Sequence, residues 1–207
     1  MLVTFGAMQQ QPEWIDPLLS KLEIKALNEM QSAAFKAQET HHDIMLLSAT
    51  GSGKTLAFLL PLVPLLRTAT TSSLALVIVP SRELALQIET VFKSMGLGVK
   101  ATCCYGGHKV EIEENNLRQP PALLIGTPGR LADHIRRGNI TTTSIQTLVL
   151  DEFDKSLELG FQEEMAFIIG SLPNLSRRIL TSATSIDKVP DFVGLQDPQI
   201  LDFVSNS

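Results

Sequence analysis

A glycine-rich segment in the first quarter of the chain has the residue types of a phosphate-binding loop. Its sequence is Ser48-Ala49-Thr50-Gly51-Ser52-Gly53-Lys54-Thr55. Backbone N–H groups of such a loop can surround an anion, and the start of the following helix adds a favourable dipole. Lys54 would reach the outer phosphates of a nucleotide, and the Thr55 hydroxyl would bind Mg²⁺. Residues 50–55 therefore predict a nucleotide site, although the strict pattern has glycine at the position of Ser48.

Two adjacent acids follow a later apolar run, where they suit an Mg²⁺–phosphate site. The run ends in Asp151-Glu152-Phe153-Asp154. Asp151 can hold the ion through water, because Mg²⁺ keeps several waters in proteins. Glu152 can orient and deprotonate the water that attacks the γ-phosphate. Acids at the end of a strand are commonly solvated turn residues, but the phosphate loop upstream favours the catalytic interpretation.

Three further segments resemble the starts of helices and contain glycine, proline or arginine. They are Pro80-Ser81-Arg82, Tyr105-Gly106-Gly107 and Thr127-Pro128-Gly129-Arg130. Ser81 and Thr127 are typical capping residues, and Pro128 suits the first helical position. Each segment alone is compatible with an ordinary cap whose arginine lies on a solvated face. Together they predict a track of N–H groups and arginines for successive phosphates, as a nucleic-acid backbone presents them.

Hydroxyl side chains follow the last predicted strand, at Ser182-Ala183-Thr184. The hydroxyl groups of Ser182 and Thr184 are able to hydrogen-bond Asp154 and so to couple the acidic loop to a neighbouring surface. A plain serine–threonine turn is the competing interpretation. The two interpretations differ in whether these hydroxyl groups contact Asp154.

Short apolar runs that alternate with helix-like stretches are expected to position these residues. Strands are predicted at 43–47, 74–79, 99–104, 122–125, 147–150 and 178–180, and helices at 54–66, 82–95, 109–117, 130–137 and 161–170. Continuously apolar runs suit strands that are buried on both faces of a parallel sheet. The alternation predicts an open α/β sheet between helices, with every strand-to-helix turn at one edge. Residues 1–42 are expected to be helical, with Pro12 and Pro17 limiting the helix starts.

The order of these segments also bears on the strand order. Three predicted strands lie between Thr55 and Asp151 in the sequence. We therefore expect the acidic strand to be separated in space from the strand of the phosphate loop, as in P-loop enzymes that activate water with an inserted glutamate. One compact domain is expected, because no linker, repeat or low-complexity stretch interrupts the pattern.

Composition narrows the class of protein further. The chain has 207 residues, of which 44% are apolar and 19% charged, so it can fill a large core and is not a disordered linker. Because its formal net charge is −5, nucleic-acid binding must rely on local groups. No apolar run approaches the roughly 20 residues of a membrane span, and no secretory signal is visible. Cys103 and Cys104 are adjacent, so they should point to opposite faces of a strand as reduced thiols of a cytoplasmic protein.

Six segments, taken in order, resemble the motifs of the DEAD-box RNA helicases. The family has AxTGSGKT, PTRELA, GG, TPGR, VLDEAD and SAT, and this chain has SATGSGKT, PSRELA, Gly106-Gly107, TPGR, VLDEFD and TSAT. The resemblance implies the amino-terminal RecA-like domain of that family. Its fold is a three-layer P-loop NTPase domain, whose central, mostly parallel sheet is flanked by helices. Residues 1–42 would form its helical Q-motif region and residues 43–207 its P-loop core.

The resemblance also implies roles for the residues that match the motifs. Those that would hold ATP and Mg²⁺ are Gln31, Thr50, Gly51, Ser52, Gly53, Lys54, Thr55 and Asp151. Those that would hydrolyse ATP and couple hydrolysis to strand separation are Lys54, Asp151, Glu152, Ser182 and Thr184. Those that would line the RNA backbone are Pro80, Ser81, Arg82, Gly107, Thr127, Gly129 and Arg130. Thr55 and Asp151 would be the metal ligands, and the amide of Gln31 would read adenine.

Some positions depart from the family's pattern. Ile24 stands where the family has an aromatic residue that stacks on adenine, and Leu27-Asn28 replaces a Pro-Thr pair. Phe153 replaces the small third residue of the acidic box. It is expected either to point away from the neighbouring carboxylates or, through its bulk, to shift their loop. Phe5 lies one residue out of register with an isolated aromatic upstream.

A second RecA-like lobe of the family carries an arginine-rich HRxGRxxR stretch, and nothing after Thr184 resembles it. Because missing arginine fingers cost about 10³–10⁵ in turnover in other phosphoryl-transfer enzymes, the chain is expected to need that lobe.

Two hypotheses about function follow from these motifs. One is the ATP-binding lobe of an ATP-dependent RNA helicase, and the other is a non-catalytic RNA- or protein-binding module derived from such a lobe. A small-molecule P-loop kinase would leave PSRELA and TPGR unexplained.

Overall fold

A seven-stranded sheet organises residues 12–186 and 188–204, the parts of the chain that the computed structural model describes. The strands are β1 Asp43–Leu47, β2 Ala75–Ile78, β3 Ala101–Cys104, β4 Leu123–Gly126, β5 Thr147–Leu150, β6 Arg177–Ser182 and β7 Gln199–Asp202. Their order across the sheet is β3-β4-β2-β5-β6-β1-β7, and every neighbouring pair is parallel. The predicted α/β fold with a parallel sheet is confirmed.

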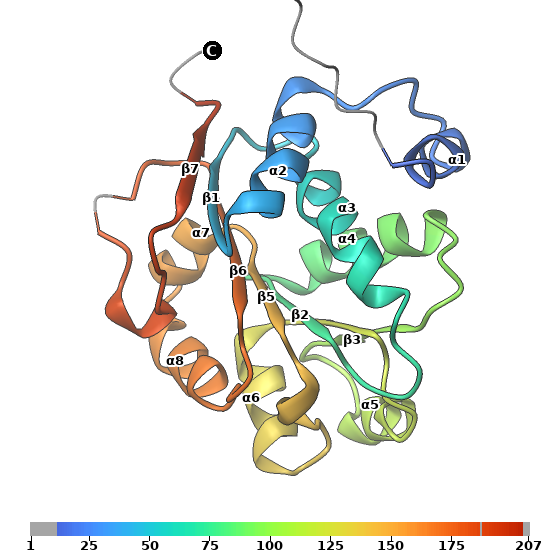
Figure 1. Ribbon diagram of the computed structural model, residues 1–207. Helices are drawn as coiled ribbons and strands as arrows, with labels where there is room; N and C mark the ends of the chain where they lie inside the picture. Colours follow the sequence, from blue (N-terminus) through green and yellow to red (C-terminus); the bar gives the residue numbers. More distant parts are fainter. Residues whose placement is uncertain (1–11, 187, 205–207) are drawn as a thin grey trace, which may run out of the picture.

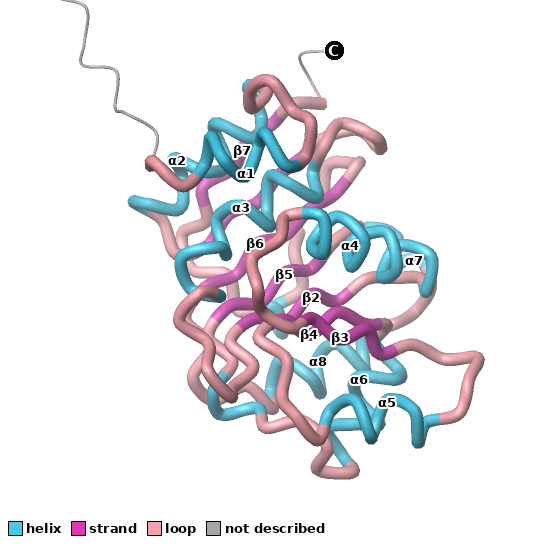
Figure 2. The backbone as a smooth tube through the Cα atoms, turned by 90° about the vertical axis from the view of Figure 1, so that its right-hand side faces the viewer, coloured by secondary structure: helices cyan, strands magenta, loops and turns pink. Residues whose placement is uncertain are grey.

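Helices cover both faces of this sheet (Figure 1). They are α1 Ile15–Lys21, α2 Glu29–Thr40, α3 Lys54–Leu66, α4 Arg82–Ser94, α5 Val110–Leu117, α6 Pro128–Arg136, α7 Phe153–Glu158 and α8 Gln162–Gly170, with short 3-10 turns at Thr142–Ser144 and Asp191–Val193. Figure 2 shows α3 and α4 on one side of the strands and α5, α6 and α8 on the other. The result is the three-layer arrangement that the alternation of runs predicts.

Alternate residues of each strand face two separate cores. In β2, Ala75 and Val77 pack with α3 and α4, whereas Leu76 and Ile78 pack with α6 and α8. Because both faces are covered, all four residues are buried, which explains the continuously apolar run in the sequence. A third, smaller cluster joins Met30 of α2 to β1 and α3.

The parallel direction of the strands brings the turns that precede helices to one edge of the sheet. Helices α3, α4, α6 and α7 begin within seven residues of the ends of β1, β2, β4 and β5. Strand β6 lies between β5 and β1. The acidic strand is therefore separated from the phosphate-loop strand as expected, but by a strand that comes later in the sequence than both.

Two elements were not predicted from the sequence. Helix α7 has six residues, too few to display a helical period. Strand β7 pairs with β1 at the edge of the sheet, and its Ile200 is 57% exposed, so it lacks the continuous apolar run of a central strand. Helix α6 begins at Pro128, the first helical position that the capping pattern predicts and two residues ahead of the helical spacing at 130–137.

The two cysteines lie on opposite faces of β3, as their adjacency predicts. Cys103 packs against the core under α3 and α4, and Cys104 is buried in the other core. Both are free thiols. Burial raises the pKa of the Cys103 thiol to about 12 and also raises that of Cys104, so both are protonated at neutral pH.

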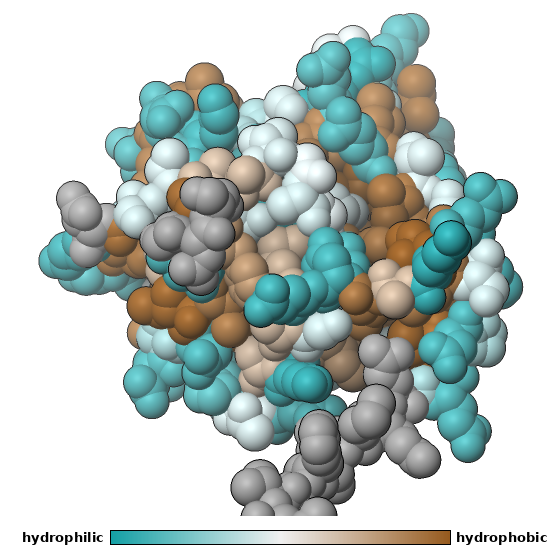
Figure 3. Space-filling model, turned by 90° about the horizontal axis from the view of Figure 1, so that it is seen from above, coloured by the Kyte–Doolittle hydropathy of each residue, from teal (hydrophilic) through white to brown (hydrophobic). Residues whose placement is uncertain are grey.

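The surface is mixed in character. Seen from above, polar side chains alternate with separate apolar areas (Figure 3). The large apolar side chains that are exposed within the described ranges are Ile112, Leu159, Ile200 and Val204. Among the helices described, none has the length and apolar character that a membrane crossing requires.

Candidate functional site

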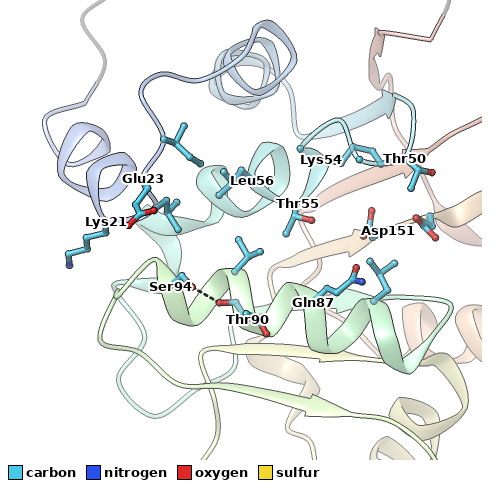
Figure 4. Close-up of a pocket in the computed structure, with 17 residues that line it drawn as sticks. Lys21, Glu23, Thr50, Lys54, Thr55, Leu56, Gln87, Thr90, Ser94 and Asp151 are labelled. Atoms are coloured by element: carbon cyan, nitrogen blue, oxygen red, sulfur yellow. Dashed lines mark hydrogen bonds between the residues drawn. The ribbon is translucent and has the colours of Figure 1, made fainter.

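A groove of about 570 Å³ opens beside the carboxyl ends of β1 and β5 (Figure 4). Its walls are the phosphate loop, residues 21–24 ahead of α2, one face of α4 and the two acids that follow β5. Figure 4 shows Lys54, Thr55 and Asp151 toward one end of the groove, and Lys21 and Glu23 toward the other. The structure thus brings the predicted nucleotide loop and the predicted acidic pair to one cavity.

Left-handed glycines shape the phosphate loop. Gly51 has φ +80° and Gly53 has φ +92°, a region that other residues rarely adopt. Lys54 opens α3, and its ammonium is largely buried and donates to the carbonyl of Ser48 at 2.9 Å. The loop therefore folds around its own lysine, and an incoming phosphate would compete with that carbonyl for the ammonium.

Asp151 is a buried carboxylate with one strong partner. Thr181 Oγ1 donates to Asp151 Oδ1 at 2.5 Å. Burial raises the pKa of Asp151 to about 6, while the Thr181 hydrogen bond and the Lys54 charge oppose that rise. A carboxylate that is costly to ionise within the protein gains by meeting a cation.

Glu152 has a backbone conformation that its residue type disfavours. Its φ of 49° and ψ of 51° are left-handed, and its N–H donates to Thr181 Oγ1 at 3.0 Å. Such conformations persist only where the surroundings hold them, and they concentrate at functional sites. The turn separates the side chain of Glu152, which lines the groove, from that of Phe153, which enters the core.

Thr181 is a site residue that the sequence motifs did not single out. It donates to Asp151 and accepts from the N–H of Glu152, so one hydroxyl holds both acids. The parallel register pairs Leu150 with Leu180, which sets Asp151 beside Thr181. The TSAT segment contained the residue, but the register that gives it this role is not visible in a sequence.

Asp154 connects the acidic turn to the segment after β6. Its Oδ2 accepts from Thr184 Oγ1 at 3.0 Å and from the N–H of Ala183 at 3.2 Å. The predicted contact is therefore present for Thr184. It is absent for Ser182, whose hydroxyl donates to the Thr184 carbonyl at 2.6 Å and accepts from its N–H, because Ser182 is buried at the strand end.

The amide of Gln31 joins α2 to the phosphate loop. Its Oε1 accepts from the N–H of Asn28 at 3.0 Å, and its Nε2 donates to the carbonyl of Gly53 at 3.2 Å. Asn28 caps α2 and donates to the carbonyl of Ser52 at 3.0 Å. The segment predicted to read adenine thus also supports the loop predicted to hold phosphate.

The departures from the expected pattern have separate outcomes. Phe153 is fully buried, with its ring 6.5 Å from that of Phe192, so it points away from the groove and leaves the acids there. Ile24 lines the groove. Phe5 lies outside the described residues.

Residues of the predicted phosphate track come together around the loop 105–108. The Arg82 guanidinium lies 4.9 Å from the centre of the Tyr105 ring. Gly107 has φ +94° and is exposed beside Arg82. Arg130 Nη2 donates to the carbonyl of His108 at 3.2 Å. Arg82 and Arg130, which lie far apart in the sequence, therefore flank the same loop.

Other members of that track differ in how far they are exposed. Ser81 is exposed and caps α4 by accepting from the N–H of Leu84 at 3.2 Å. Thr127 precedes α6 without a side-chain cap, and Gly129 is exposed. Pro80 is buried at the turn ahead of α4, next to the capping residue Ser81.

Comparison with known proteins decides the family. The family model described as DEAD/DEAH box helicase matches residues 28–192. The chain belongs to the DEAD/DEAH box helicase family. Relatives include the ATP-dependent RNA helicase DeaD of Buchnera aphidicola from Schizaphis graminum, 36% identical over 87% of this chain and 30% of the relative. DeaD of Escherichia coli K12 is 40% identical over 69% of this chain and 23% of the relative. The chain therefore spans about a quarter to a third of the length of these helicases.

Solved structures of helicases share the fold. A hypothetical ATP-dependent RNA helicase from Sulfolobus tokodaii superposes with a TM-score of 0.83 at 26% identity, over 93% of this chain and 57% of that chain. A DEAD box protein from Methanococcus jannaschii gives 0.85 at 25% identity, over 94% and 55%. The sheet and its helices are thus those of a RecA-like helicase domain.

Proposed function

We propose that this chain is the ATP-binding lobe of an ATP-dependent RNA helicase, in which ATP hydrolysis drives duplex unwinding or the remodelling of RNA–protein complexes. The observation that carries the proposal is the convergence of Lys54 and Asp151 on one groove, beside a second set of exposed helix starts at the same sheet edge. We take residues 1–42 as the Q-motif region and residues 43–207 as the P-loop core of a single domain.

In this proposal, the loop at residues 50–55 binds the phosphates of ATP through its backbone N–H groups and Lys54. The hydroxyl of Thr55 and the carboxylate of Asp151 are hard oxygen donors that suit Mg²⁺, and both line the groove. When bound, Mg²⁺ would neutralise charge on the phosphates. Glu152 accepts the proton of the attacking water, and Gln31 contacts the adenine.

Thr184 and Asp154 supply the proposed coupling. Their hydrogen bond ties the acidic turn to the loop after β6, so a change at the phosphates would reach the partly exposed segment 183–186. Ser182 supports this connection indirectly, by fixing the backbone of Thr184.

RNA is the proposed polyanion, bound through its backbone and without sequence readout. Arg82, Gly107, Gly129 and the N–H groups at the starts of α4 and α6 would contact successive phosphates. The net charge of −5 means that these local groups must carry the interaction. We expect the protein to act in the cytoplasm and to work with a second RecA-like lobe.

The test is titration of an ATP analogue with Mg²⁺ into the chain and into Lys54→Ala. We expect the substitution to abolish measurable affinity, because the Lys54 ammonium lies inside the loop, against the carbonyl of Ser48. Lys36→Ala, which removes an exposed lysine of α2, is the matched control and should bind normally. Unchanged affinity in Lys54→Ala would refute the assignment of the phosphate loop.

The alternative function, a non-catalytic binding module, is favoured by one observation. Ile24 lines the groove where an aromatic would stack on adenine, and the Gln31 amide already bonds to the phosphate loop. Joining a second RecA-like lobe and measuring ATPase activity with RNA separates the two functions. RNA-stimulated turnover supports the helicase, and its absence in a two-lobe protein that binds RNA supports the module.

A further inference from the structure

A buried carboxylate lies beneath the two loops of the proposed RNA track. Glu113 of α5 is only 1% exposed. Its Oε1 accepts from the backbone N–H of Tyr105 at 2.9 Å and contacts Nε2 of His108 at 2.9 Å. Its Oε2 contacts Nε2 of His134 at 2.6 Å and Nη1 of Arg130 at 3.3 Å. One carboxylate oxygen therefore contacts the loop 105–108, and the other contacts α6.

The contact with His134 is directional. His134 is fully buried, and its Nδ1 lies 3.0 Å from Nδ2 of Asn139. An amide nitrogen only donates, so Nδ1 accepts and Nε2 carries the proton that is donated to Glu113. The N–H of Tyr105, Nε2 of His134 and Nη1 of Arg130 thus all donate to the Glu113 carboxylate.

Arg130 contributes to the same network rather than extending freely toward solvent. Its side chain is 14% exposed, and its two terminal nitrogens bond Glu113 and the His108 carbonyl. A second arginine is linked less directly, because the Arg82 guanidinium rests over the ring of Tyr105, whose N–H bonds Glu113. Glu113 thus contacts Arg130 directly and is linked to Arg82 through Tyr105.

A metal site is a less suitable explanation of this cluster. The ligand atoms of Cys104, Glu113 and His134 lie within 4.8 Å of one another. A cation there would sit beside the charged Arg130 and would displace the hydrogen bond between His134 and Glu113. Hydrogen bonds already satisfy Glu113 and His134 without an ion.

We propose that Glu113 is a positioning residue for RNA binding, which holds the loop 105–109 and the turn 127–130 at a fixed separation. The covalent backbone limits the distance between neighbouring phosphates, so two anion sites act on one strand only if their separation stays within that limit. The inference depends on the proposed RNA binding. It adds a residue that contacts no phosphate and lies outside every motif that the sequence singles out.

The experiment compares Glu113→Gln and Glu113→Ala with Glu114→Gln, the matched control on the same helix. Glu114 is more exposed, and its ion pair with Arg137 is 3.5 Å long. Amide hydrogen exchange without RNA is the first readout. Glu113→Ala should speed exchange in both 105–109 and 127–131. Glu113→Gln keeps one acceptor oxygen, so exchange should stay slow in one of these segments and become faster in the other.

RNA affinity is the second readout, measured with a labelled single-stranded oligouridine. We expect Glu113→Ala to weaken binding about tenfold, as loss of a supporting partner does at other preorganised sites. Affinity for an ATP analogue and exchange at residues 48–55 should stay unchanged, which shows that the variant is folded. Arg130→Lys, which keeps the charge but cannot bridge two acceptors in the same way, should lose as much affinity as Glu113→Ala.

The outcomes of these measurements separate the two proposals. If the unmodified chain binds RNA but Glu113→Ala binds equally well with unchanged exchange, the positioning role is refuted and the proposed function stands. If Arg130→Lys keeps its RNA affinity while Glu113→Ala loses it, Arg130 acts through its charge and the shared network is refuted. If the unmodified chain binds no RNA even when it is joined to a second RecA-like lobe, the proposed function fails and the positioning role in RNA binding fails with it.

Discussion

At the scale of single residues, the two adjacent acids of the groove differ in their exposure to solvent. Asp151 is buried and hydrogen-bonded to Thr181, whereas Glu152 is partly exposed in a left-handed turn. A metal ligand benefits from a fixed position, and a residue that accepts a proton from water must reach solvent. In the proposed function, these adjacent residues therefore have different roles, because the backbone turns sharply between strand and helix.

The raised pKa of Asp151 predicts a pH dependence. Burial moves it from an ordinary value of 3.8 to about 6, so the carboxyl is protonated in the folded chain below that pH. Mg²⁺ must then displace a proton, and Mg²⁺-dependent nucleotide affinity should fall up to about tenfold per pH unit below 6. The free energy of unfolding should fall as the pH rises from about 4 to about 6. In this range the group is already ionised in the unfolded chain but still protonated in the folded one, so raising the pH favours unfolding.

Titration of the nucleotide with and without Mg²⁺, between about pH 5 and pH 8, measures this effect. Asp151→Asn is the control, since it removes both the titration and the metal ligand. Its affinity should be low at every pH and insensitive to Mg²⁺. A wild-type profile that is flat through this range would contradict the assignment.

Thr181→Val should impair the site while preserving its shape. Valine has the same branching but neither donates to Asp151 nor accepts from Glu152, so two hydrogen bonds are lost. We expect weaker Mg²⁺-dependent nucleotide binding and a loss of about 1–3 kcal/mol in unfolding free energy, since buried polar groups lose their partner. Thr147→Val, at the opposite end of β5 and also buried, should leave nucleotide binding unchanged.

At the scale of elements, close packing positions the loops of the track. Helix α6 starts directly after β4, and Gly126 allows the approach of its neighbours. A Cβ atom on Gly126 would lie 2.4 Å from the backbone oxygen of Cys104 and 2.8 Å from Cγ of Leu131. The strand β3 and helix α6 therefore meet at a position where a side chain has no room.

Gly126→Ala should consequently destabilise the fold by about 3 kcal/mol, at the upper end for an overpacked core. Gly129→Ala is the matched control, because a Cβ atom there meets nothing within 4 Å. Chemical denaturation of the two variants makes the comparison. Equal stability of Gly126→Ala and the unmodified chain would show that β3 and α6 are less tightly packed than described.

Sequence reasoning was most reliable for elements whose burial is uniform. The runs around β2, β4 and β5 predict their strands because both faces are covered. Helix α7 and strand β7 escaped prediction because one is too short and the other lies at an edge. Residues with motif signatures, such as Lys54 and Asp151, were predicted, whereas Thr181 and Glu113 depend on register and tertiary contacts that no local pattern carries.

At the scale of the whole molecule, the carboxyl edge of the sheet carries both of the proposed anion sites. The groove proposed to bind a nucleotide lies beside β1 and β5, and the proposed RNA track lies beyond β2, β3 and β4. Strand order alone produces this division, since β2 and β4 are neighbours on one side of β5 and β1 lies on the other. A polyanion and a nucleotide can therefore bind the same edge without sharing residues.

Hydrogen exchange of the chain with saturating Mg²⁺ and ATP analogue, and separately with single-stranded RNA, tests this division most directly. The nucleotide should slow exchange in residues 48–55 and 151–152. The RNA should slow exchange in residues 81–85, 105–109 and 127–131, at the opposite part of the edge. Protection of the same segments by both ligands, or protection confined to segments away from this edge, would contradict the account.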